Sequence, residues 1–415
     1  MNATEKIQII GIGDDGLDGL TAQARRLIER ADLLVGDEAT MALVPAAGKT
    51  RLPIGGNLES IVDRIATAKS GPIVVLASGD PLFYGVARYL CDRLGKDRFD
   101  VLPHVSSMQL AFARVKESWE EAFLTNLANH SLEDVIEKIR VAEKVGIFTS
   151  ESCPPPAVAR GLLDSRIDNF TAYVCENLGS PDERVTHAEL RDIVREEFSP
   201  LNVMILVRKP QAPDRPTEAI VDRIAAAKAG PIVVLASGDP LFYGVARYLC
   251  DRLGKDRFEV LPHVSSMQLA FARVKESWEE AFLTNLANHS LEDVIEKIRV
   301  AEKVGIFTSE SCPPPAVARG LLDSRIDNFT AYVCENLGSP DERVTHAELR
   351  DIAREEFSPL NVMILVRKPQ APDRPTEAMG RRLFGNPDQV FLQSRPKHGL
   401  LTPAEVRAIA LAQMD

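Results

Sequence analysis

A tandem repeat fills most of this chain of 415 residues, because residues 61–219 recur almost letter for letter as residues 220–378. We call these segments the first copy and the second copy. They differ only at Thr67/Ala226, Ser70/Ala229, Asp100/Glu259 and Val194/Ala353. Residues 1–60 occur once, so two bodies share one set of N-terminal parts and only one of them can be complete. A repeat of this length also excludes a solenoid, whose units have about 20 to 50 residues.

The composition is that of a globular protein of about two to four domains, with 45% hydrophobic and 26% charged residues. A net charge of -11 without a stripe of Lys and Arg argues against nucleic-acid and anionic-membrane partners. The six cysteines form no CxxC pair, which predicts buried thiols in a reducing compartment and no metal site. Because no basic leader and no apolar run of membrane-spanning length is present, we expect a cytoplasmic protein.

Short runs rich in Ile and Val alternate with stretches of helical period, which predicts a parallel α/β sheet. Within the first 102 residues the predicted strands are 8–10, 33–35, 73–76 and 99–102, and the predicted helices are 20–31 and 82–94. Further on, the pattern predicts helices at 108–115 and 132–142 and strands at 145–148, 171–175 and 202–207.

Two proline-rich segments, 209–219 and 368–378, lack apolar periodicity and are predicted to be exposed linkers. They divide the chain into a complete unit, 1–208, a partial duplicate without the first strands, 220–367, and a tail, 379–415. Thr402, with Pro403 and Glu405 after it, is typical of a helix start. The tail therefore resembles the opening of a further domain.

The first predicted strand leads into Gly11-Ile12-Gly13-Asp14-Asp15-Gly16, which matches GxGxxG, and Asp37 and Glu38 follow the next strand. This arrangement is typical of a dinucleotide site. The carboxylates of Asp14 and Asp15 would repel a pyrophosphate at that turn, however. The glycines would also suit a turn with no ligand at all.

Further motifs favour another interpretation. The run Gly79-Asp80-Pro81-Leu82-Phe83-Tyr84-Gly85 follows a strand, and Val105-Ser106-Ser107-Met108-Gln109-Leu110-Ala111-Phe112-Ala113-Arg114 opens a helix. With the first glycine turn and Leu20-Thr21, these motifs resemble the tetrapyrrole methylase family. Over 7–207 the chain is most similar to the carbon-5-methylating domain of the bifunctional precorrin methylases. Residues 384–407 resemble the entry to their second domain, which methylates carbon 15 and decarboxylates.

The resemblance implies a fold with two lobes, a parallel α/β N-terminal lobe and a mixed α/β C-terminal lobe, followed here by the partial duplicate. It also implies S-adenosylmethionine-dependent methylation of carbon 5 of a precorrin in cobalamin biosynthesis. Because the tail lacks a methyl-donor loop, we expect no carbon-15 methylation or decarboxylation. The alternatives are an NAD(P)-dependent oxidoreductase built on the first turn, and an inactive duplication product. We expect a homo-oligomer, with the partial copy as one route of association.

Two runs depart from the family pattern. The chain has Ala39-Thr40 where the family often has Arg-His, and Leu127-Ala128-Asn129-His130 where the family has Leu-His-Gly-Arg. Neither run therefore supports an assignment of contacts to substrate carboxylates.

The resemblance also implies donor-site residues. These are Gly11, Gly13, Gly79, Asp80, Pro81, Ser106, Ser107 and Thr149, with Gly238, Asp239, Pro240, Ser265 and Ser266 in the second copy. Each type has a purely structural role as well, because Gly-Asp-Pro is often only a turn and Ser before a helix is often only a cap.

Four further side chains are candidates for the acceptor side of the reaction. His104 and His130 could take the proton that the methylated carbon loses, or could be surface groups. Arg88 and Arg114 could bind carboxylates of a tetrapyrrole, or could belong to a solvated helix face.

The missing N-terminal parts decide what we expect of the second copy. Without the first strands its sheet would keep unpaired backbone edges and uncovered apolar faces. Loop-closure entropy favours docking of residues 1–60 on the nearer, first copy by about 2 kcal/mol. We therefore expect the second copy to be loosely packed, exchanged between chains or degraded.

Overall fold

The computed structural model describes residues 6–209 and 232–369, apart from residues 14, 46–47, 56–57 and 69–70, together with residue 224. The chain divides into two compact units, residues 1–280 and 281–415. The first unit therefore holds the N-terminal parts, the first copy and the beginning of the second copy. The two predicted linkers, for the most part, and the helix predicted after Thr402 lie outside the described residues.

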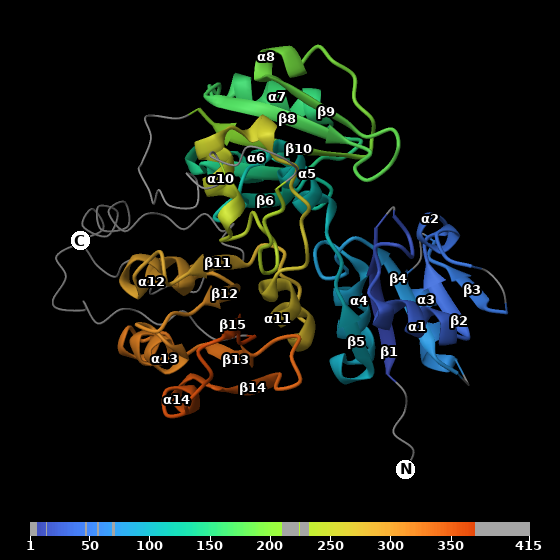
Figure 1. Ribbon diagram of the computed structural model, residues 1–415, viewed down its shortest axis with the longest axis vertical. Helices are drawn as coiled ribbons and strands as arrows, with labels where there is room; N and C mark the ends of the chain where they lie inside the picture. Colours follow the sequence, from blue (N-terminus) through green and yellow to red (C-terminus); the bar gives the residue numbers. More distant parts are fainter. Residues whose placement is uncertain are drawn as a thin grey trace, which may run out of the picture. The chain divides into compact units, whose positions relative to one another are not determined.

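A five-stranded sheet with parallel pairing throughout forms the first lobe, in blue and cyan in Figure 1. Its strand order is β3-β2-β4-β1-β5. The strands are β1 (Ile7–Ile12), β2 (Leu33–Gly36), β3 (Thr50–Pro53), β4 (Ile73–Ser78) and β5 (Phe99–Leu102). The helices are α1 (Ala22–Arg30), α2 (Glu38–Ala42), α3 (Leu58–Thr67) and α4 (Val86–Leu94), with the 3-10 turn η1 (Lys96–Arg98). The central strands are buried along most of their length, as expected for parallel strands covered on both faces.

The second lobe is a mixed sheet in the order β6-β7-β10-β8-β9, in which β6 and β7 are parallel and the other pairs antiparallel. Its strands are β6 (Phe123–Asn126), β7 (Lys144–Phe148), β8 (Phe170–Glu176), β9 (Arg184–Glu189) and β10 (Asn202–Arg208). Its helices are α6 (Leu132–Val141), α7 (Pro155–Asp164) and α8 (Leu190–Ile193), and α5 (Ser107–Val115) precedes it. The predicted combination of a parallel and a mixed lobe is confirmed.

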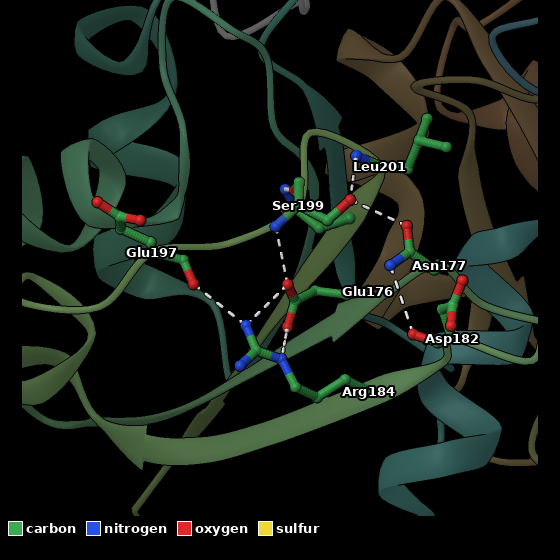
Figure 2. Close-up of polar contacts among 8 residues, drawn as sticks. Glu176, Asn177, Asp182, Arg184, Glu197, Ser199 and Leu201 are labelled. Carbon is green, nitrogen blue, oxygen red and sulfur yellow. Dashed lines mark hydrogen bonds and ion pairs between the residues drawn. The ribbon is translucent and has the colours of Figure 1, made fainter.

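A polar network closes the end of β8 (Figure 2). The buried carboxylate of Glu176 accepts two hydrogen bonds from Arg184, at 2.6 and 3.0 Å, and one from the backbone N–H of Ser199 at 2.8 Å. The side chain of Asn177 accepts a hydrogen bond from the Ser199 hydroxyl at 2.9 Å. Because each buried oxygen has a donor, the network fixes the loop between α8 and β10.

The second unit repeats the mixed sheet of the second lobe, in the order β11-β12-β15-β13-β14. Its strands are β11 (Phe282–Asn285), β12 (Lys303–Phe307), β13 (Phe329–Glu335), β14 (Arg343–Glu348) and β15 (Asn361–Arg367). Its helices are α12 (Leu291–Val300), α13 (Pro314–Asp323) and α14 (Leu349–Ile352). The polar network recurs there on Glu335 and Arg343. This part of the second copy therefore forms a complete lobe with its own core.

The beginning of the second copy keeps its helices but not its strands. The helices α10 (Val245–Leu253) and α11 (Ser266–Val274) and the 3-10 turn η2 (Lys255–Arg257) are present. Residues 232–237, whose sequence is that of β4, form no strand, and neither do residues 258–261. In the first copy β4 and β5 both pair with β1, which occurs once in the chain. The apolar side chains of Val233 and Leu235 are consequently 78% and 90% exposed, which confirms the uncovered faces expected from the sequence.

One predicted helix begins later than the sequence pattern indicates. The helix predicted at 82–94 starts at Val86, because the residues before it form a turn in which Tyr84 has a φ of 56°. None of the described helices has the length and apolar character needed to cross a membrane.

Candidate functional site

The first lobe has a topological switch point between β1 and β4. The chain leaves β1 toward β2 on one side of the sheet, and it leaves β4 toward β5 on the other side. Neighbouring strands with diverging connections leave a crevice at their carboxyl ends, which is where open α/β sheets bind ligands. Gly13 follows β1 at this edge and Gly79 follows β4.

The turns at this edge approach so closely that only glycine fits. A Cβ at Gly11 would lie 2.2 Å from the carbonyl oxygen of Gly79 and 2.7 Å from the Cβ of His104. Gly79 has a φ of 63°, a conformation that strains residues with a side chain. Its N–H donates to the carbonyl oxygen of Ile12 at 2.9 Å. The glycines therefore bring His104 beside the carboxyl end of β1.

A cavity of about 540 Å³ opens beside the turn after β1, next to the start of α1 and the residues that follow β5. Among the residues predicted from the sequence, Gly11, Gly13, His104 and Arg114 line it. The walls are mainly apolar, and the volume is in the range of small-molecule sites. The structure thus brings the first glycine turn, one candidate base and one candidate carboxylate-binding residue to one place.

The side chain of Asp80 is used inside the protein. It is buried, and its carboxylate accepts hydrogen bonds from the N–H of Leu82 at 2.9 Å, from Gln268 Nε2 at 2.8 Å and from Trp278 Nε1 at 2.9 Å. Burial raises the pKa of Asp80, and these donors lower it by less. The carboxylate of Asp80 is therefore committed to contacts within the protein, and none of Gly79, Asp80 and Pro81 lines the cavity.

The hydroxyl groups of Ser106 and Thr149, both predicted for the donor site, have partners within the protein. Ser106 is the N-cap of α5 and forms a capping box with Gln109, while Ser107 is the exposed first residue of that helix. The hydroxyl of Thr149, after β7, donates to Asn202 Oδ1 at 2.9 Å. These contacts hold the ends of α5 and β7 in place.

Two of the candidates for the acceptor side, His130 and Arg88, lie outside the cavity lining. His130 Nε2 lies 2.6 Å from the carboxylate of Glu280. Arg88 forms ion pairs with Glu279 and Asp92. Arg114 does line the cavity, but its guanidinium binds Glu183 in an ion pair. Of the two predicted proton acceptors, His104 is the one at the cavity.

The second copy repeats the donor-type turn without its surroundings. Gly238 has a φ of 68°, and Ser265 forms the same capping box with Gln268. Asp239 accepts hydrogen bonds from Gln109 Nε2 at 2.9 Å and from Trp119 Nε1 at 3.0 Å. These contacts mirror those of Asp80, so within the first unit each copy supplies donors to the buried aspartate of the other.

No motif in the sequence predicted the stacked aromatic rings that join the two copies. The chain has two tryptophans, one per copy. Trp278 stacks on Phe83 with ring centroids 3.9 Å apart, and Trp119 stacks on Phe242 at 3.9 Å. Each copy has a single tryptophan just after an amphipathic helix, and this tryptophan could have indicated the contact. Buried aromatic side chains contribute much of the energy of contacts between packed surfaces.

The described residues contain no group of three or more His, Cys, Asp or Glu side chains arranged to hold a metal ion. The cysteines are free thiols, four of them buried and two partly buried. The polar groups that face the cavity therefore belong mostly to His, Arg, Asp, Thr and Gln side chains and to the backbone.

The fold and the cavity together define a two-lobed α/β protein with a ligand site at the carboxyl ends of parallel strands. The family model for tetrapyrrole (corrin/porphyrin) methylases matches residues 6–194 and 199–353. The chain belongs to the tetrapyrrole methylase family, as the sequence motifs predicted.

Two curated relatives and one solved structure show the extent of the similarity. The chain is 30% identical over 179 residues to the cobalt-precorrin-7 C(5)-methyltransferase of Salmonella typhimurium, which covers 43% of this chain and 88% of the relative. It is 32% identical over 201 residues to the precorrin-6Y C(5,15)-methyltransferase [decarboxylating] of Sinorhizobium sp., which covers 48% of each. The structure of uroporphyrin-III C-methyltransferase from Thermus thermophilus with S-adenosyl homocysteine has a TM-score of 0.41 and 20% identity, and covers 49% of this chain and 92% of that one.

Proposed function

We propose that this protein is an S-adenosylmethionine-dependent methyltransferase that methylates carbon 5 of a precorrin in cobalamin biosynthesis. Family membership supports methyl transfer, and the two relatives above are both named for carbon 5. The observation that carries the proposal is the cavity at the carboxyl ends of β1 and β5, where Gly11, Gly13 and His104 meet.

The glycine-lined edge fits a methyl donor. Side chains at Gly11 and Gly13 would collide with their neighbours, since a Cβ at Gly13 would lie 2.9 Å from His104 Cε1. Because glycine has no side chain, the backbone N–H and C=O groups at these positions come within reach of a ligand. When bound, S-adenosylmethionine supplies an electrophilic methyl group on a sulfonium sulfur. The turn after β1 would hold it by backbone contacts, because Gly11 and Gly13 line the cavity.

Positioning accounts for most of the expected rate enhancement. Holding two reactants in line and excluding water is worth up to about 7–11 kcal/mol. The mainly apolar walls of the cavity serve that purpose. His104 has the role of proton acceptor, because it lines the cavity and its ring Nδ1 is within 3.3 Å of the Val105 carbonyl, which fixes the ring. The proton that leaves the methylated carbon goes to this imidazole.

The proposal includes a cytoplasmic location, which the free thiols support because oxidising compartments favour disulfides. The alternative of an NAD(P)-dependent oxidoreductase has less support. Asp15 lines the same cavity, where it would repel a pyrophosphate. The family match also favours methyl transfer.

The test uses the full chain with S-adenosylmethionine carrying a ¹³C methyl group and the macrocycle that the Salmonella relative accepts. We expect one labelled methyl group at carbon 5, detected by NMR, with the Salmonella enzyme as positive control. Thermal stability should rise with S-adenosylhomocysteine and stay constant with NADH. Stabilisation by NADH alone would support the oxidoreductase, and no transfer with no ligand binding would support an inactive product.

A substitution tests the role of His104. His104→Ala should lower kcat by about 10²–10⁴-fold, the usual contribution of a general base, with little change in affinity for S-adenosylhomocysteine. His187→Ala is the matched control, because His187 stacks on Tyr173 in the second lobe and should leave kcat unchanged. An unchanged kcat in His104→Ala would remove His104 from the mechanism.

A further inference from the structure

The cavity is lined by the same segment of both copies. His104, Arg114 and Leu102 of the first copy face it, and so do their equivalents His263, Arg273 and Leu261 of the second copy. All of these residues belong to the first compact unit. The second copy therefore supplies part of the wall of a site whose glycine turns come from the N-terminal parts.

Reciprocal contacts fix this placement of the second copy. Gln109 and Gln268 donate to each other at 3.0 Å, and the backbone N–H groups of Trp119 and Trp278 donate to carbonyl oxygens of the opposite copy at 3.2 Å. The helix α11, which ends at Val274, packs against β5 of the first copy. The wall is thus held by buried hydrogen bonds as well as by stacked rings.

The chemistry of this wall suits a polycarboxylate. Guanidinium and imidazolium groups bind carboxylates by charge-assisted hydrogen bonds. His263 is exposed where His104 is half-buried, because the second copy has no strand equivalent to β1 beside it.

We propose that His263 and Arg273 of the second copy bind carboxylate side chains of the tetrapyrrole held at the first copy's site. The proposal rests on the proposed function and assigns a role to the incomplete copy. In this role the second copy forms the far wall of the cavity, and a complete parallel sheet within the second copy is not required. The chain then carries one complete donor site and one composite acceptor site.

Binding of uroporphyrin III to the full chain tests this directly, since the probe is fluorescent and carries eight carboxylates. Arg273→Gln and His263→Ala should each weaken its binding by about tenfold, the usual value of a lost charge-assisted hydrogen bond, and the loss should shrink at high salt. Arg273→Lys, which keeps the charge, should recover part of the affinity. Arg354→Gln, on an exposed residue of the second copy, is the matched control.

The outcomes separate this proposal from the proposed function. Unchanged uroporphyrin binding in the double variant Arg273→Gln/His263→Ala, or no binding by the wild-type chain, would overturn the role of the second copy. Binding that depends on both residues, without methyl transfer by the wild-type chain, would overturn the proposed function alone. Where transfer occurs, the variants should raise KM for the macrocycle and leave KM for S-adenosylmethionine unchanged.

Discussion

At the scale of single residues, the two buried aspartates carry the contact between the copies. Asp80 and Asp239 each accept one local N–H and two side-chain donors from the opposite copy. Burial raises the pKa of both carboxyl groups. A carboxyl group in this position is desolvated, so its ionised form is less stable than it would be in an unfolded chain.

This shift predicts how stability depends on pH. Because the folded-state pKa of Asp80 is raised above 3.8, the stability that it contributes is fully present below that pH and is lost as pH rises through the raised pKa. The free energy of unfolding of the wild-type chain, minus that of Asp80→Asn, should therefore fall as pH rises from acid to neutral. Urea titrations between about pH 4 and pH 7 measure this difference. A difference that grows with pH would mean that the three donors outweigh burial.

The tryptophans allow a matched pair of substitutions. Trp278→Ala removes the stack on Phe83 and leaves the buried Asp80 with one donor fewer. We expect the free energy of unfolding to fall by about 3–5 kcal/mol, as for other large-to-small changes in a core. Trp119→Ala should cost about the same, because its contacts with Phe242 and Asp239 are the mirror image. Urea denaturation followed by far-UV circular dichroism checks both, and a large inequality would contradict the reciprocal arrangement.

At the scale of secondary-structure elements, strands with apolar runs were predictable and partly exposed ones were not. The predictions for β1, β2, β4 and β5 agree with the structure to within two residues. The strands β3, β6 and β9 were missed, because only one residue each of β3 and β6 and none of β9 is buried. A strand at the margin of a sheet lacks the alternation on which such a prediction depends.

The second copy shows a limit that no local pattern can overcome. Residues 73–78 and 232–237 have the same sequence, yet only the first segment is a strand. The difference is the presence of β1, which pairs with β4 through residues 8–12. The loss of this strand in the second copy could therefore be predicted only from the absence of a second β1, not from the residues of the segment itself.

Hydrogen exchange followed by mass spectrometry measures this difference within one sample. Amides of 73–78 should exchange on the order of a thousandfold more slowly than those of 232–237, because buried central strands open only with nearly global unfolding. Peptides that extend back to Ser70 or Ala229 differ in mass, so the two copies are resolved despite their identical strands. Amides of 124–126 and 283–285, in β6 and β11, are the internal control and should exchange alike. Equal protection of 73–78 and 232–237 would show that the second copy has found another partner strand.

At the scale of the whole molecule, the site could be predicted only in part. The first glycine turn was found from a motif, and His104 was one of two histidines considered as proton acceptors, whereas the Gly79-Asp80-Pro81 turn does not line the cavity. That Asp80 would receive its donors from Gln268 and Trp278 was not predictable, because one copy of the motif does not show what faces it. Contacts between the two copies depend on how the whole chain folds, so a motif within one copy does not predict them.

The reciprocal contacts also predict the behaviour of a chain with a single copy. Residues 1–209 contain both sides of the contact, because Gln109 and Trp119 are the equivalents of Gln268 and Trp278. The Salmonella relative, of which 88% is matched by 179 residues of this chain, is itself of single-copy length. We therefore expect residues 1–209 to form a twofold dimer in which Asp80 of each chain accepts from Gln109 and Trp119 of the other.

Sedimentation velocity measures this association. The dissociation constant should be about micromolar or tighter, the range of specific interfaces with buried aromatic and hydrogen-bonded centres. Trp119→Ala in the same fragment should give monomers, because it removes the ring stack and one donor to Asp80 from both halves at once. Thr125→Ala, in β6 of the second lobe, is a control that should keep the dimer. A wild-type fragment that stays monomeric at every concentration would mean that the copies associate only because the linker between them holds them at high local concentration.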